Sequence, residues 1–250
     1  MSFLSRRKLI TGGLATAAGA SGMAVAARLA SRYGLIPPDH GGIYAPGETL
    51  TYAAQRILTR HSMAREFPRS LISKTPFANG RPLQQENYLR SQAAGFADWH
   101  LQVDGMVARP VSFSRADLRK LPSRSQITHI ACEEGWSFIA EWTGVPLSVL
   151  LDAAGPRPDA KFVASYSMEK DASDSIDMAD ALHPQTLVTY GMNGGDLPVG
   201  HGGPLRLRVP RQLGYKSLKY LNRLTVTDDL NRLGRELSDP SPEYAWYAGI

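Results

Sequence analysis

The sequence predicts a mixed α/β fold of the α+β class, with mixed sheets and irregular connections. The chain has 250 residues, of which 43% are hydrophobic, so it can bury one large core or two modest ones. Short apolar, strand-like runs are interleaved with short amphipathic helical stretches, and Pro or Gly stands at most of the joints. No internal repeat or low-complexity run interrupts this pattern, which is typical of a globular protein.

The first element is a predicted twin-arginine export signal over residues 1–30. Arg6 and Arg7 stand just before an apolar run rich in Ala and Gly, Leu9–Ala27. A Sec signal or a signal anchor has a similar outline, but Ala and Gly make a stable membrane span less favourable than Leu and Ile would. We therefore expect a periplasmic protein exported by the twin-arginine route, membrane-anchored if the signal stays uncleaved.

Residues 31–98 are predicted to form an irregular N-terminal arm packed on the domain that follows. Pro and Gly pairs punctuate its first part, and Thr75–Gly80 has turn chemistry. Two helices are expected within it, at Thr51–His61 and at Glu86–Ala93.

Residues 99–250 are predicted to form the main domain. Trp99, Leu101 and Val103 alternate with polar residues before Asp104-Gly105, and Val107 resumes the alternation, which indicates a hairpin. Ser114 is expected to cap a short helix, with an acidic residue at its third position. Further helices are predicted at Pro146–Ala154 and Asp177–Leu182, and strands at Gln126–Ala131, Lys161–Tyr166, Thr186–Gly191, Leu205–Val209 and Leu218–Val226.

The only cysteine of the chain, Cys132, follows the strand predicted at Gln126–Ala131 and opens a polar turn that contains Gly135. A lone cysteine is most often a small buried hydrophobic residue. A thiol that follows a strand and begins a turn is instead accessible to a ligand. One cysteine excludes an intramolecular disulfide, a multi-cysteine zinc site and an iron–sulfur cluster, so metal chemistry here needs one thiolate plus ligands from elsewhere.

The net charge of +5 and the isoelectric point near 9.4 do not predict nucleic-acid binding. Arg and Lys are scattered along the chain rather than gathered in a stripe, and part of the excess lies at the N-terminus. We interpret the charge as favouring solubility and a pocket for an anionic ligand.

Two downstream stretches concentrate hydrogen-bond donors beside glycines. The first holds His201, Gly202-Gly203 and Arg206, and the second holds Ser217 and Lys219. The glycines allow a close approach of the backbone to a ligand, and these donors suit a phosphate and a polar heterocycle.

Activation of Cys132 by a histidine is an alternative that the residues leave open, because it would make a cysteine-dependent hydrolase or transferase. His129 is three positions away and should lie on the opposite face of the strand, so His201 is the candidate base for this alternative.

Three blocks of sequence resemble the sulfite oxidase family of molybdopterin-dependent oxidoreductases. They read HIACEEGWSFIAEWTGVPL, YGMNGGDLPVGHGGPLRLRVP and QLGYKSLKYL, and the resemblance covers Trp99 to Asp228. It implies a sulfite-oxidase-type molybdopterin-binding domain in which Cys132 is the protein ligand to molybdenum. It further implies cofactor contacts from Asn79, Tyr166, His201, Arg206, Ser217, Leu218 and Lys219.

The resemblance also implies the reaction and its partners. A soft thiolate suits molybdenum, and the pterin brings the other sulfur ligands. The expected activity is oxygen-atom transfer to or from a small-molecule oxo donor or acceptor, of sulfite or sulfoxide type. The electrons would be exchanged with a separate protein, a cytochrome or a membrane quinone-linked subunit. A monomer is expected, because the chain ends soon after Asp228, before the dimerisation domain that eukaryotic and plant-type relatives carry.

Two departures from the family pattern bear on the substrate. Ala78 stands where sulfite oxidases carry a substrate-binding arginine, and Arg81 is a candidate replacement. Glu133 follows the cysteine where relatives commonly have an apolar residue, and a carboxylate there disfavours an anionic substrate. These departures favour a bacterial relative that acts on a sulfoxide. A periplasmic binding or interaction domain that has the fold but no cofactor is the non-enzymatic alternative.

Overall fold

The computed structural model describes residues 25, 28, 45–59, 62–230, 232–233 and 249. The predicted export signal, except for residues 25 and 28, lies outside the described residues. Contacts divide the chain into two units, Met1–Arg60 and His61–Ile250.

The described part of the first unit is chiefly one helix, α2 (Ala45–Thr59). It begins earlier than the predicted helix Thr51–His61, because Pro46 needs no backbone N–H in the first turn of a helix. Arg56 lies one turn from Tyr52, with its guanidinium carbon 5.2 Å from the centre of the ring. Among the described residues, no helix has both the length and the apolar character needed to cross a membrane.

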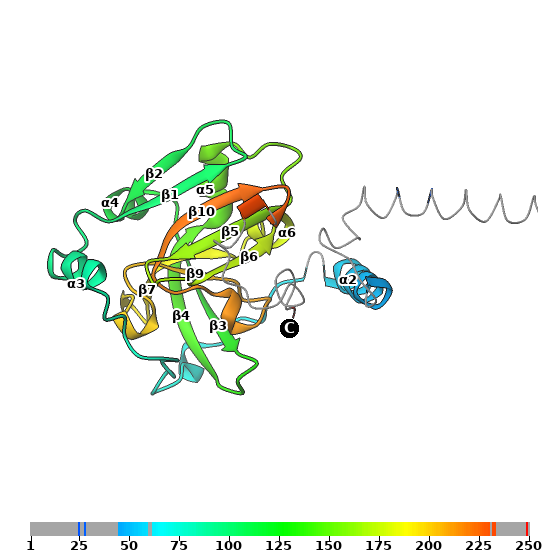
Figure 1. Ribbon diagram of the computed structural model, residues 1–250. Helices are drawn as coiled ribbons and strands as arrows, with labels where there is room; N and C mark the ends of the chain where they lie inside the picture. Colours follow the sequence, from blue (N-terminus) through cyan, green and yellow to red (C-terminus); the bar gives the residue numbers. More distant parts are fainter. Residues whose placement is uncertain are drawn as a thin grey trace, which may run out of the picture. The chain divides into compact units, whose positions relative to one another are not determined.

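The second unit contains two five-stranded sheets, both largely antiparallel (Figure 1). The first has the order β2-β1-β10-β5-β6, in which β1 and β10 are the parallel pair. Its strands are β1 (His100–Gly105), β2 (Val111–Ser114), β5 (Phe162–Ser167), β6 (Ser173–Asp177) and β10 (Leu221–Thr227). The second has the order β3-β4-β7-β8, with β9 paired to β7. Its strands are β3 (Arg124–Ala131), β4 (Ser137–Pro146), β7 (Leu187–Met192), β8 (Gly195–Asp196) and β9 (Arg206–Arg208).

Short helices precede the first strand or lie between strands, as the sequence predicts for an α+β domain. They are η1 (Arg69–Leu71), α3 (Glu86–Ala93), α4 (Arg115–Lys120), α5 (Leu147–Ala154), α6 (Met178–Ala181), η2 (Val199–His201) and η3 (Gly214–Lys216). Ser114 caps α4 by accepting a hydrogen bond from the backbone of Asp117, so the predicted capping box is confirmed. Helix α5 ends at Gly155, which has the left-handed conformation.

The predicted hairpin at Trp99–Val107 is wrong in its second strand. Strand β1 pairs with β2, whereas Val107 makes only an isolated bridge with Pro156. Gly105 ends β1 with φ +85° and lies so close to β10 that a Cβ there would be 2.2 Å from the carbonyl oxygen of Val226. A glycine is therefore needed here because β1 and β10 approach closely, and not because the chain makes a tight turn.

The unit has a large core and a smaller cluster near Cys132, and a further cluster contains Leu83, Tyr88 and Tyr220. The large core is formed by aliphatic side chains of β1, β5, β7, β9, β10 and α5. The cluster near Cys132 contains Ile130, Phe138, Trp142 and Met192, and Trp136 packs against it. This cluster supports the end of β3 at which Cys132 lies.

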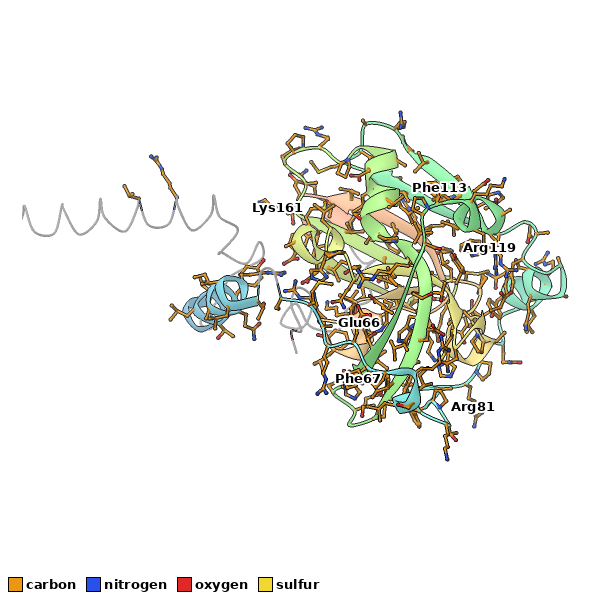
Figure 2. All side chains as sticks on the ribbon, turned by 180° about the vertical axis from the view of Figure 1, so that it is seen from behind. Glu66, Phe67, Arg81, Phe113, Arg119 and Lys161 are labelled. Atoms are coloured by element: carbon orange, nitrogen blue, oxygen red, sulfur yellow. The ribbon has the colours of Figure 1, made fainter. Side chains whose placement is uncertain are left out.

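The segment before α3 runs along β3 of the second sheet. Glu66 bridges to Thr128, the N–H of Phe67 donates to the carbonyl of Ile127 at 2.9 Å, and Figure 2 shows both residues on this segment. The N–H of Ser73 donates to the carbonyl of Ile139 on β4, also at 2.9 Å. These bonds carry the chain across the hairpin of β3 and β4 towards Asn79.

Candidate active site

Cys132 comes directly after β3, at the start of the turn that leads into β4. The backbone N–H of Cys132 donates to the carbonyl of Trp136 at 3.0 Å, and the N–H of Gly135 donates to the carbonyl of Cys132 at 3.0 Å. Gly135 has φ +88°, a conformation that glycine adopts without strain. Cys132 is 8% exposed, yet it lines a cavity of about 370 Å³, so the thiol faces an internal space.

Among the described residues, no histidine forms a hydrogen bond with the thiol. Its Sγ donates to Oε2 of Glu133 at 2.8 Å. Burial, followed by this hydrogen bond, raises the pKa of the Cys132 thiol to about 11. A cysteine nucleophile requires the opposite shift, so this geometry does not support a cysteine-dependent hydrolase. His129 lies beyond reach as a base, because its ring packs beside Phe67 on the other face of β3.

The cavity brings together most of the residues that the sequence singles out. Its lining includes Asn79, Cys132, Arg206, Ser217, Leu218 and Lys219. The lining also includes Phe77, Gly80, Arg81, Glu133, Glu134, Trp136, Phe138, Glu169, Gly214, Tyr215 and Tyr220. The three sequence blocks therefore meet around one space, although they are far apart in the chain.

One wall of the cavity carries two cations, the buried Arg206 and the half-buried Lys219, that form no ion pair among the described residues. The Nη1 of Arg206 donates to the carbonyl of His201 at 3.1 Å, and its Nε is buried without a partner. The Nζ of Lys219 donates to the carbonyls of Gly200, at 2.8 Å, and Asn79. Burial is the main cause that lowers the pKa of Arg206 to about 10 and that of Lys219 to about 8. Within the part of the chain that the structure describes, neither side chain forms an ion pair.

Arg208 does not line the cavity but lies with Arg206 on β9. It was not predicted from the sequence as a residue that supports the site. Its guanidinium donates to the carbonyl of His129 at 2.6 Å and to the hydroxyl of Thr128 at 3.2 Å. Trp142 lies between the two arginines, with ring-centre distances of 5.4 Å to Arg206 and 5.5 Å to Arg208. Burial, followed by the neighbouring Arg206, lowers the pKa of Arg208 to about 9. The alternation of Arg206 and Arg208 along a strand was the available signal, because such residues share one face.

His201 and Tyr166 lie outside the lining of the cavity. The His201 ring packs edge-on against Phe138 at 5.6 Å, and its Nδ1 is buried without a partner. Burial, then the charges of Arg206 and Lys219, lowers the pKa of His201 to about 4, so the ring is neutral at pH 7. Tyr166 is half-buried on β5, where the guanidinium of Arg223 lies 5.4 Å from its ring.

Ser217 contributes backbone rather than a free hydroxyl to the cavity. Its Oγ accepts from the N–H of Val209 at 3.1 Å and faces Arg208 at 3.4 Å. The hydroxyl is thus held by the protein, and it fixes the loop that carries Leu218 and Lys219.

Carboxylates and aromatic rings form the other side of the cavity. The Nδ2 of Asn79 donates to Oε2 of Glu134 at 2.7 Å, and Nε1 of Trp136 donates to the same oxygen at 2.6 Å. Phe77 packs against Trp136. Ala78, in the position of the substrate-binding arginine, is not among the lining residues, whereas the exposed Arg81 is.

These residues fit a metal cofactor that carries an anionic group. A cation removed from water is costly unless an anion neutralises it, and the buried Arg206 and half-buried Lys219 supply donors that suit a phosphate. Among the described residues, no three His, Cys, Asp or Glu side chains converge as a metal site, so a metal bound here would have Cys132 as its protein ligand and need further ligands from the cofactor. The fold and the cavity thus define a cofactor-dependent enzyme domain.

Comparison with known proteins identifies the family. Residues 89–232 match the family model described as the oxidoreductase molybdopterin binding domain, and the chain belongs to this family of enzymes. The chain is 36% identical over 189 residues to the putative protein-methionine-sulfoxide reductase subunit YedZ1 of Azospira oryzae, covering 76% of this chain and 69% of that protein. It is 30% identical over 167 residues to the protein-methionine-sulfoxide reductase catalytic subunit MsrP of Ralstonia nicotianae, covering 61% of this chain and half of that protein.

A solved structure shows the same fold. The sulfane dehydrogenase SoxCD from Paracoccus pantotrophus superposes with a TM-score of 0.52 at 26% sequence identity, over 54% of this chain and 40% of that one. The expectations of an α+β molybdopterin-binding domain and of an oxidoreductase of the sulfite oxidase type are confirmed.

Proposed function

We propose that this protein reduces a methyl sulfoxide, of the kind formed by oxidised methionine, with a molybdenum–pterin cofactor ligated by Cys132. The observation that carries the proposal is the cavity itself. Its lining combines the Cys132 thiol and the carboxylates Glu133 and Glu134 with Arg206 and Lys219, which form no ion pair among the described residues. The names of the two reductase relatives agree with the proposal.

The reaction consumes one sulfoxide, two electrons and two protons, and it releases one thioether and one water. The bound molybdenum–pterin group supplies the two-electron oxygen-atom transfer. The electrons come from a separate redox protein of the haem or quinone-linked class. The relatives' names describe subunits, which supports a partner chain in this role.

The residues of the chain have distinct roles in this proposal. Arg206 and Lys219 hold the phosphate of the cofactor, and Cys132 ligates the metal as a thiolate. Glu133 already accepts the thiol hydrogen bond, so its Oε2 is placed to take the proton that Cys132 loses on ligation. The carboxylates at the mouth disfavour sulfite and other anions and leave a neutral sulfoxide as the favoured substrate.

We also propose that the protein works in the periplasm after export through the twin-arginine route. Arg6 and Arg7 before an Ala- and Gly-rich run support this, since that route carries folded proteins that already hold a cofactor. Replacing both residues by Lys should leave the protein, with its cofactor, in the cytoplasmic fraction of the cell. Unchanged periplasmic recovery of the variant would contradict the proposed route.

The direct test of activity uses the purified holoprotein with a reduced viologen dye as electron donor. We expect oxidation of the dye with methionine sulfoxide, and no reduction of an oxidised acceptor such as ferricyanide when sulfite is supplied in a separate assay. Cys132→Ser should lose stable molybdenum binding and this activity together. Activity of a metal-free protein, or sulfite oxidation that exceeds sulfoxide reduction, would overturn the proposal.

A further inference from the structure

An aromatic ledge, defined here as Phe77 and Trp136, forms the rim of the cavity. Phe77 is 49% exposed, although it is a large apolar side chain. The centres of the two rings are 5.6 Å apart with an interplanar angle of 34°, so the rings form one sloping apolar surface. Both residues belong to the lining of the cavity that contains Cys132.

The ledge reaches from solvent to the immediate neighbourhood of the thiol. A Cβ placed at Gly214 would be 3.1 Å from Cη2 of Trp136 and 3.3 Å from Cβ of Cys132. The inner edge of the Trp136 ring and Cys132 therefore flank the same glycine. A small group lying on the ledge has its reactive atom beside the predicted metal ligand.

The orientation of the Trp136 ring is fixed before any ligand arrives. Its Nε1 donates to Glu134 at 2.6 Å, and its ring stacks on Phe138 with centres 6.1 Å apart and an interplanar angle of 19°. A rigid ring loses little conformational entropy on binding, so it is suited to a contact that selects a ligand by shape.

The charge around the ledge restricts what can bind to it. Glu133, Glu134 and Glu169 belong to the same lining, and each carries a carboxylate at the exposed side of the cavity. The cations Arg206 and Lys219 of the same lining are assigned to the cofactor, so the exposed Arg81 is the remaining lining cation against these three carboxylates, and an anion is disfavoured at the ledge. The methyl group and sulfur of a neutral methyl sulfoxide pack favourably on aromatic rings.

We propose that Phe77 and Trp136 are specificity-determining residues that bind the sulfur and methyl group of a methyl sulfoxide. This inference rests on the proposed function and assigns the substrate contact to this ledge. Phe77, at the exposed end, discriminates between substrates with an attached chain and bare small sulfoxides, because only the former extend along the ledge.

The test compares Phe77→Ala with a matched control, Leu71→Ala, in the holoprotein. Leu71 is 50% exposed and lies on the same segment but not in the cavity lining. For N-acetyl-methionine sulfoxide amide we expect Phe77→Ala to raise KM about tenfold with kcat within about twofold, as for the loss of one apolar contact and one sulfur–ring contact. The KM for dimethyl sulfoxide should change much less, Phe77→Tyr should restore the wild-type KM, and Leu71→Ala should change neither.

A second measurement separates this inference from the proposed function. The thioether product, N-acetyl-methionine amide, is titrated into the holoprotein while tryptophan fluorescence is followed, with molybdenum content and melting temperature measured for each variant. Weaker binding to Phe77→Ala at unchanged molybdenum content supports the ledge. A wild-type enzyme that reduces sulfoxides, together with unchanged KM and product affinity in Phe77→Ala, would overturn the ledge alone. A wild-type enzyme that reduces no sulfoxide would overturn both.

Discussion

Two lysines in the third sequence block differ in their surroundings: the fully buried Lys216 forms an ion pair, whereas the half-buried Lys219 forms none among the described residues. Lys216 is fully buried, and its Nζ donates to Oδ1 of Asp174 at 2.6 Å and to the carbonyl of Ser175 at 2.9 Å. Lys219 donates only to carbonyls among the described residues, those of Asn79 and Gly200. The first charge is neutralised within the fold, and the second faces the cavity.

The difference distinguishes residues that stabilise the fold from residues that hold a ligand. A buried ion pair adds little net stability, but the loss of one partner is costly because the other charge stays buried. A cation that has no counter-ion within the fold can instead attract an anionic ligand. Arg206 extends the second group, since its buried guanidinium also forms no ion pair in the described part of the chain.

The largest expected effect comes from removing the ion pair between Lys216 and Asp174. Asp174→Asn removes the carboxylate charge that faces the fully buried Lys216 and should lower the free energy of unfolding by about 3–5 kcal/mol. Urea denaturation of the metal-free protein measures this change. Asp159→Asn, which affects an exposed pair with Arg157, should cause no measurable loss. A loss no larger in Asp174→Asn than in this control would refute the structural role of the buried pair.

Lys219→Met tests whether the charge of Lys219 contributes to binding of the cofactor. A charge-assisted hydrogen bond to a phosphate contributes about 1.5–3 kcal/mol, so we expect cofactor affinity to fall about 10- to 100-fold. The metal-free protein should lose far less stability than Asp174→Asn does, because no ion pair among the described residues is lost and the cost of desolvating the charged amine is removed. Molybdenum and pterin content after dialysis, with urea denaturation in parallel, measures both. Lys170→Met, at an exposed position, is the control, and full cofactor retention in Lys219→Met would count against a phosphate contact.

Gly202→Ala sharpens the comparison by moving Lys219 without removing its charge. Gly202 has φ +102°, and a Cβ there would be 2.7 Å from the Cβ of Lys219. We expect a loss of about 1–2 kcal/mol in the free energy of unfolding from strain and collision, with weaker cofactor retention. Gly194→Ala is the matched control, since Gly194 has φ +85° but nothing within 4 Å of an added Cβ. Equal cofactor retention in the two variants would show that the position of Lys219 is unimportant.

The sequence predicts the residues of the cavity better than their electrostatic state. Cys132, Arg206 and Lys219 stand in recognisable blocks, and each reaches the cavity because its block ends a strand or follows a tight turn. The contrast between Lys216 and Lys219 was not predictable, because it depends on β6, which supplies Asp174. That strand, Ser173–Asp177, has mostly polar residues and no apolar alternation, so no strand was predicted there.

Other misses have similar causes. Strand β4 was not predicted, because it contains Gly144 and ends at Pro146, and both residue types are unfavourable in the interior of a strand. Gly144 is required there, because a Cβ would be 2.3 Å from the carbonyl oxygen of Val188 on the neighbouring strand. Phe77 was not predicted as a site residue, since contact between Phe77 and Trp136 depends on the path of the chain across β3 and β4.

The smallest expected effect is a difference in how stability depends on pH. Burial, followed by the charge of Arg206, lowers the pKa of Lys219 to about 8 from an ordinary value of 10.5, against a smaller opposing effect of Glu169. Between these two values the folded state has lost the proton and the unfolded state still binds it. The unfolded state therefore binds more protons in this window, and stability contributed by this group rises with pH. Below pH 8 the cost of burying the charged lysine is fully present.

Metal-free wild-type protein should accordingly gain stability between pH 8 and pH 9.5 relative to Lys219→Met, which carries no titrating group at this position. Urea midpoints of both proteins at several pH values measure the difference. The comparison stops below pH 10, where Tyr88 acts in the opposite direction because burial raises its pKa to about 12 from 10. The same titration should weaken loading of the cofactor above pH 8, because a neutral amine attracts a phosphate less strongly than an ammonium does. Parallel pH profiles for the two proteins would mean that Lys219 is neutralised within the fold, as Lys216 is, and that the contrast between the two lysines does not hold.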